Sequence, residues 1–132
     1  MEGIIRKYNW QTILLQEIEK SKVLKFEYAV NDCTIWAANI IKSYTNLVWE
    51  PKWKNKKEAL RYHREKPMED RVSEVLGPYR NNLLTTQRGD LVQKDLGMDA
   101  ALGICLGSQC AFLYNEGICY VPLNECTYSW RI

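Results

Sequence analysis

The residues best placed for chemistry are Asp32 and Cys33, at a polar corner between an aromatic segment and an apolar one. The side chain of Asp32, or of Asn31 beside it, is suited to cap a helix, because its oxygen can accept free backbone N–H groups. Cys33 would then occupy the first or second helical position. There the positive end of the helix dipole lowers the pKa of a thiol and favours a nucleophilic thiolate. A cysteine is also among the most buried residue types, so Cys33 is equally well read as a core residue.

The residues after Cys33 predict the helix that would position it. They are apolar on most sides of a helical projection: Ile35, Trp36, Ala37, Ala38, Ile40, Ile41 and Tyr44. A helix that is apolar around most of its circumference is usually buried. We therefore expect a central buried helix at about residues 32–45.

Three further helices are predicted in the first part of the chain. Residues 8–21 carry apolar side chains at helical spacing. Residues 57–66 form a charged helix, and residues 68–76 form another that ends at Gly77-Pro78. Residues 46–55 contain a proline and are predicted as a loop.

The rest of the chain predicts an antiparallel sheet, because short apolar runs alternate with turn residues. The expected strands are 91–92, 100–106, 109–114 and 118–121, with turns at 107–108 and 115–117. Residues 94–99 are predicted as a loop, and residues 124–132 as a tail in which Tyr128 and Trp130 fold back onto the body. Helices followed by a meander indicate an α+β fold, with the central helix packed on a C-terminal sheet.

Size and composition exclude several classes of protein. The chain has 132 residues, 46% hydrophobic and 26% charged, which favours one globular domain over residues 1–132. A net charge of +2 gives no electrostatic case for nucleic acid. No apolar run approaches the roughly 20 residues of a membrane span. Residues 1–7 lack the apolar core of a secretion signal, so we expect a reducing cytosol and free thiols.

Hairpin register predicts which cysteines meet. A two-residue turn at 107–108 sets Cys105 opposite Cys110 and Ala101 opposite Tyr114. We expect the face that carries residues 101, 103 and 105 to point at Cys33, so that three thiols lie near one another. A fourth ligand is not evident and CxxC pairs are absent from the sequence, so we expect neither a metal nor another cofactor.

Aromatic residues are the candidates for partner binding. Trp49 and Trp53 lie among lysines, and Tyr128 and Trp130 lie in the tail. Aromatic side chains are enriched at protein interfaces, although these could instead cover the domain's own core. The single histidine, His63, lies among charged residues of a helix, so we expect it to be solvated.

An ordered set of motifs adds a resemblance. Asp32-Cys33, the apolar helix, Gly89-Asp90-Leu91-Val92 and the segment 102–107 (Leu-Gly-Ile-Cys-Leu-Gly) together resemble the NlpC superfamily of papain-like cysteine peptidases, which cleave peptidoglycan stem peptides. The resemblance covers residues 26 to about 122. It implies an NlpC-like fold with Cys33 at the position of the nucleophile.

The same resemblance implies a lost catalytic site. Alignment of the segment 102–107 on the family strand places Ala101 where the general-base histidine belongs and Tyr114 at the position of the third polar residue. Alanine cannot accept a proton, and tyrosine, with a pKa of about 10, is a poor base near neutral pH. General acid–base catalysis contributes about 10²–10⁴-fold, so we expect no peptidase activity.

The length and the ending Val121-Pro122-Leu123 followed by an aromatic tail resemble small phage proteins from the tail-gene region. This resemblance implies a structural component of a bacteriophage tail tip, assembled in the host cytoplasm and located in the virion. Its partners would be the hub, the distal tail protein and the tape-measure protein. The alternative is an active cysteine peptidase or amidase that cleaves cell-wall peptides during DNA entry, with Cys33 as nucleophile and a base from His63 or a partner. A third, weaker hypothesis is a small binding or toxin-immunity module.

Overall fold

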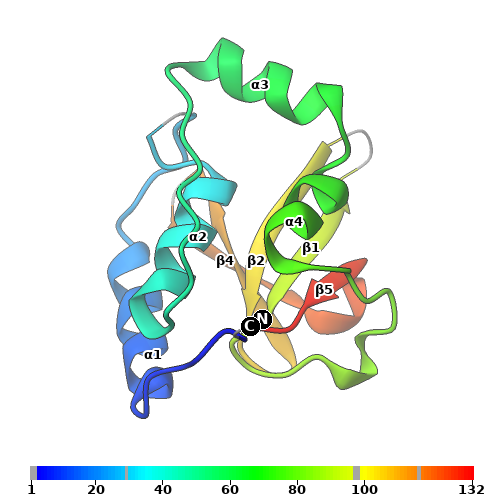
Figure 1. The fold of residues 1–132 in the computed structure, drawn as a ribbon. Coiled ribbons are helices and arrows are strands. Elements are labelled where there is room, and N and C mark those ends of the chain that lie inside the picture. Colours follow the sequence, from blue (N-terminus) through cyan, green and yellow to red (C-terminus); the bar gives the residue numbers. More distant parts are fainter. Residues whose placement is uncertain (1–2, 29, 97–98, 116) are drawn as a thin grey trace.

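A computed structural model describes residues 3–28, 30–96, 99–115 and 117–132, which form an α+β fold (Figure 1). The helices are α1 (Trp10–Ser21), α2 (Cys33–Tyr44), α3 (Lys56–Glu65) and α4 (Met68–Leu76). The strands are β1 (Leu91–Leu96), β2 (Asp99–Cys105), β3 (Gln109–Tyr114), β4 (Gly117–Pro122) and β5 (Tyr128–Trp130). Two short 3₁₀ helices, η1 (Leu83–Thr85) and η2 (Leu123–Glu125), precede β1 and β5. The α+β class and the four predicted helices are confirmed, with boundaries that shift by one or two residues.

Helix α2 lies at the centre of the main core, and the predicted central buried helix is confirmed. The indole Nε1 of Trp36 donates a hydrogen bond to Ser21 Oγ at 2.9 Å, which ties α2 to the end of α1. The Tyr44 hydroxyl donates to the backbone oxygen of Gly89 at 2.6 Å, which ties the other end of α2 to the turn before β1. Both ends of the helix are therefore held by buried polar contacts as well as by packing.

The five strands form one antiparallel sheet in the order β4-β3-β2-β1-β5. The predicted pairing of Cys105 with Cys110 is confirmed. The predicted loop at 94–99 is wrong for residues 94–96 and 99, which belong to β1 and β2, while residues 97–98 lie outside the described residues. The tail also contributes a strand that the sequence did not predict, since β5 pairs with β1. Of the predicted turn at 115–117, residue 116 lies outside the described residues.

The sequence analysis missed residues 93–96 of β1, and the surroundings of Gln93 explain why. Gln93 is fully buried, and its Nε2 donates to Glu69 Oε2 and to Asp95 Oδ1, both at 3.0 Å. A buried polar side chain is tolerated when it is hydrogen-bonded. Its partner Glu69 lies on α4, a contact that local composition could not reveal.

The two faces of the sheet bury different sets of side chains, because successive residues of a strand point to opposite sides. The face toward α2 contributes five strand residues to the main core: Leu91, Leu102, Ile104, Ala111 and Leu113. Helices α1, α2 and α4 supply further side chains to this core. The other face carries a smaller second core: Val92, Cys105, Cys110, Phe112 and Cys126. Leu83 of η1 and Leu123 of η2 pack against this second core.

A buried carboxylate links Arg6 near the start of the chain to Ile132 at its end, and Arg6 Nε also donates to the Ile132 backbone oxygen at 2.8 Å (Figure 1). Asp90 is 2% exposed and forms ion pairs with Arg6 at 3.1 Å and Arg80 at 3.0 Å. It also accepts the backbone N–H groups of Gln87 and Ile132. A buried charge requires such compensation, so the Gly89-Asp90 turn is fixed by partners from distant parts of the sequence.

Among the described residues, no helix has the length and apolarity needed to cross a membrane.

Candidate functional site at the N-terminus of α2

The local geometry of the Asp32-Cys33 corner follows the prediction. Asp32 has an extended backbone, and its Oδ1 accepts the N–H of Ile35 at 3.0 Å. Cys33 is the first residue of α2. The sequence therefore predicted the cap and the place of the thiol correctly.

The electrostatic state of the Cys33 thiol differs from the prediction. The side chain is 9% exposed, and burial raises its pKa above the ordinary value. The Leu102 backbone and the neighbouring Thr34 lower the pKa, but less strongly than burial raises it. Burial is the largest of these effects, so Cys33 stays a neutral thiol near neutral pH.

The structure does not bring Cys33, Ala101 and Tyr114 together. Ala101 packs against the second core, on the face of the sheet away from α2. Tyr114 is 61% exposed, and its backbone oxygen accepts the N–H of Phe26. The prediction that the 101/103/105 face points at Cys33 is wrong, because Leu102 and Ile104 occupy the α2 side. The error is one of strand phase, since a shift by one residue exchanges the two faces.

The same alternation of strand faces places the cysteines in two different cores. Cys105 and Cys110 lie in the second core with Cys126, whereas Cys33 lies in the main core. The Cys110 thiol is hydrogen-bonded to Cys105 and Cys126, which lowers the pKa of both and raises its own. All five cysteines are free thiols, and the described residues contain no group of side chains suited to hold a metal ion.

The aromatic candidates for partner binding are mostly part of the domain itself. Trp49 is 8% exposed and Trp130 is 1% exposed, so neither presents a contact surface in this structure, contrary to the prediction. Tyr128 is half-buried and packs on Tyr79, with ring centroids 4.5 Å apart. Trp53 is half-buried and donates to Asp32 Oδ2 at 2.5 Å. These side chains cover the core, which was the alternative reading of the sequence.

His63 is the functional candidate that the sequence analysis misplaced. It is half-buried rather than solvated, and the centroid of its ring lies 5.4 Å from the centroid of the Trp53 ring. Burial lowers its pKa, while the nearby Asp32 carboxylate raises it less strongly. A signal was present, since buried Ala59 lies four residues earlier and therefore on the same face of α3.

A cavity of about 290 Å³ adjoins this corner. Its lining comes from the start of α2, the loop after it, α3 and α4, and includes Thr34, Trp49, Trp53, Tyr62, His63 and Arg71. The site thus combines aromatic walls, one guanidinium, one imidazole and the hydroxyls of Thr34 and Tyr62. Such a mixture is suited to bind a small molecule, because apolar walls bury it and a few polar groups orient it.

Comparison with known proteins places the chain in a family. The profile of a family described as a domain of unknown function (DUF6950) matches residues 5–132. The chain belongs to this family. A search of curated proteins found no match to it.

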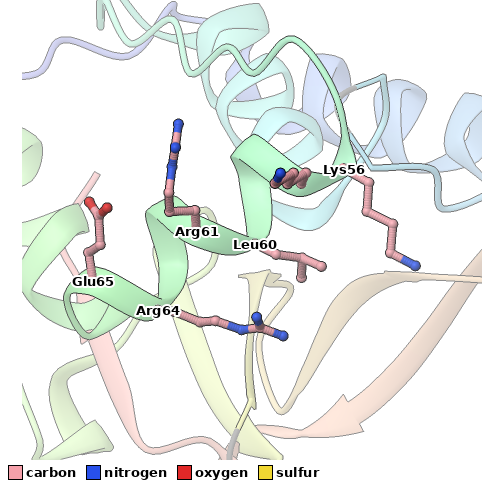
Figure 2. A pocket seen from close by; sticks show the side chains of 6 residues that line it. Lys56, Leu60, Arg61, Arg64 and Glu65 are labelled. Atoms are coloured by element: carbon pink, nitrogen blue, oxygen red, sulfur yellow. The ribbon is translucent and has the colours of Figure 1, made fainter.

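The opposite side of α3 in this DUF6950 domain forms a second, open hollow of about 680 Å³. Its lining comes from α3 alone and is mainly basic: Lys56, Lys57, Leu60, Arg61, Arg64 and Glu65. Figure 2 shows Leu60 and Arg64 projecting to one side of the helix and Arg61 projecting away from them. A surface built by one helix lacks the converging groups of the cavity at the N-terminus of α2.

Proposed function

We propose that this protein is a structural component of a bacteriophage tail tip, built on an NlpC-like fold whose peptidase site no longer works. The observation that carries the proposal is the buried Cys33 thiol at the start of a central helix, with its pKa raised by burial. The order of motifs from Asp32-Cys33 to the aromatic tail supports the fold and the tail assignment. The protein would be assembled in the host cytoplasm and reside in the virion, beside the hub, the distal tail protein and the tape-measure protein.

The chemistry of peptide cleavage explains why the thiol decides between the hypotheses. Attack on a peptide carbonyl requires a thiolate, and the leaving amine must then receive a proton from a positioned acid. Cys33 is shielded from solvent, and Ala101 supplies no titratable group. A fold retained without this chemistry is best explained by contacts with other proteins.

The first experiment measures alkylation of each thiol in the native protein by iodoacetamide near neutral pH, followed by mass spectrometry. Cys119 is half-buried and serves as the internal control, because it sees more solvent than Cys33. We expect Cys119 to react first and Cys33 to react only in denaturant, since a buried neutral thiol is a poor nucleophile. Rapid native alkylation of Cys33 would contradict the proposal.

The second experiment tests the tail assignment directly. The chain is co-expressed with hub, distal tail and tape-measure proteins of a tailed phage that encodes it, and complexes are isolated by size. We expect it at a fixed ratio in a tail-tip complex. A protein that stays a solitary monomer in every combination is not a tail component.

The position of His63 favours one second candidate, an active cysteine hydrolase. α3 brings this imidazole to the N-terminal end of α2, where it lies near Asp32 and lines the same cavity as Thr34. Catalysis would require Cys33 to become accessible to this base. Cleavage of a cell-wall peptide that is abolished by both Cys33→Ala and His63→Gln would establish this function in place of the structural one.

A further inference from the structure

Three buried polar atoms without hydrogen-bond partners belong to residues that line one cavity. They are Thr34 Oγ1, His63 Nδ1 and Arg71 Nε, and each residue lines the 290 Å³ cavity beside α2. Within the described ranges only five side-chain atoms are in this condition. Buried polar groups normally form hydrogen bonds, so three such atoms without partners at one cavity indicate that a bound molecule supplies the missing partners.

The Thr34 hydroxyl is the most enclosed of the three. Thr34 is 5% exposed and lies in the first turn of α2. The side chain of Thr34 contacts the Cys33 thiol, but sulfur is a weak hydrogen-bond partner. A hydroxyl at this place gains a strong interaction only if an oxygen or nitrogen atom enters the cavity.

Arg71 gives the cavity its charge. The guanidinium lies over the Tyr62 ring, 4.0 Å from its centroid, and its NH2 donates to the Tyr62 backbone oxygen at 3.3 Å. The ion pair of Arg71 with Glu65 is long, at 3.6 Å, and Glu65 is 62% exposed. An exposed pair is weak, so the positive charge of Arg71 is only partly compensated and its Nε–H stays available to an anion.

Glu50, the acidic side chain of the cavity lining, does not offset the positive charge of Arg71. Glu50 forms an ion pair with Lys42 at 3.0 Å, and Lys52 adds a further cation to the lining. The remaining lining is largely aromatic and apolar, with Trp49, Trp53 and Met68. At about 290 Å³ the cavity matches the lower end of ligand-site volumes, which start at roughly 300 Å³.

We propose that this cavity binds a small aromatic carboxylate. Its two oxygens accept hydrogen bonds from Thr34 Oγ1, Arg71 Nε and the Nδ1–H tautomer of His63, and its ring packs against Trp49 and Trp53. One carboxylate can accept all three bonds, because its two oxygens offer about four lone-pair positions. This inference goes beyond the proposed tail role and does not depend on it.

The single histidine provides a direct assay. His63 is the only histidine in the chain, so its imidazole C–H signals in a proton NMR spectrum have no overlap from other histidines. The probes are 3-phenylpropionate and its neutral amide, 3-phenylpropionamide, which differ only in the charged group. We expect saturable shifts of the His63 signals with the acid and at least tenfold weaker binding of the amide. Equal affinities for the two probes, or no shift with either at millimolar concentration, would overturn the proposal.

Two threonine variants separate ligand binding from stability. Thr34→Val replaces an unpaired buried hydroxyl by a methyl group, so we expect an unchanged or higher Tm together with about 10-fold or greater loss of affinity for the acid. Thr12→Val on the exposed face of α1 is the matched control and should change neither quantity. Full affinity in a folded Thr34→Val protein would exclude the hydroxyl from the site. Neither result depends on whether the protein assembles into tails, so the two proposals fail separately.

Discussion

Cys33 and Cys105 lie on opposite faces of the sheet, and the pKa values of their thiols are shifted in opposite directions. On the α2 side, Cys33 occupies a position that favours a thiolate, yet its pKa is raised because burial dominates. On the far side, Cys105 has no helix terminus, yet its pKa is lowered by hydrogen bonds from the Cys110 thiol and the Gly107 backbone. Burial therefore dominates at Cys33, and a hydrogen bond with a neighbouring thiol dominates at Cys105.

The two faces also differ in how they are packed. The main core on the α2 side includes large side chains from three helices, such as Trp36 and Tyr44. The second core is small and has three buried cysteines, with Cys119 packed against it. The residue that looks catalytic thus lies in the more heavily packed region, where a nucleophile is least accessible.

The largest expected effect tests the role of α2 in the main core. Trp36 is 2% exposed, so Trp36→Ala should lower the free energy of unfolding by about 3–5 kcal/mol through lost burial and a residual cavity. Urea denaturation followed by circular dichroism measures this change. Tyr8→Ala is the control, because Tyr8 is 99% exposed and its loss should cost no more than about 0.5 kcal/mol. Similar stabilities of the two variants would mean that α2 is not the centre of the fold.

The next effect tests the packing of the second core. A Cβ added at Gly103 would lie 2.6 Å from the Ala111 backbone oxygen and 2.7 Å from the Phe112 ring. Gly103→Ala should therefore destabilise the protein by about 1–3 kcal/mol through overpacking, as measured by the urea midpoint. Gly3→Ala, with nothing within 4 Å of the added atom, should have little effect. A neutral Gly103→Ala would show that the contact between β2 and β3 is looser than described.

A smaller effect returns to the N-terminus of α2. Asp32→Ala removes the cap of Ile35 N–H and the acceptor for Trp53, and should cost about 1–2 kcal/mol. Asp32→Asn is the control for the cap alone, because asparagine caps a helix about as well but has one acceptor oxygen, so the acceptor for Trp53 is lost in both variants. The melting temperatures of the three proteins should rank wild type and Asn above Ala. An Ala variant as stable as the Asn variant would remove the capping interpretation.

The smallest effect concerns pH. Burial lowers the pKa of His63 below its ordinary value of 6.5, so the unfolded chain binds a proton more readily than the folded one. The contribution of neutral His63 to stability is complete above pH 6.5 and is lost as the pH falls below that value toward the lowered pKa. Urea midpoints at about pH 7.5 and about pH 5.5 should show this loss in the wild type and a reduced loss in His63→Gln. An identical pH dependence in both proteins would mean that His63 is solvated after all.

Local patterns allowed much of the fold to be predicted. The helix cap at Asp32, the helix Met68–Leu76 and the strand Gln109–Tyr114 depend on neighbours within a few residues, and the structure has them as predicted. Strand β5 and the second half of β1 were missed for a physical reason. Their stability comes from partners far along the chain, such as Glu69 beside Gln93 and β5 beside β1.

The candidate site shows the same division. The sequence by itself determined that Cys33 begins a buried helix, because capping and helical periodicity are local properties. Only the tertiary structure decided that this thiol is neutral, that Ala101 lies on the other face of the sheet and that His63 joins Thr34 and Arg71 at one cavity. Desolvation, strand phase and the approach of separate helices are set by the packing of distant segments.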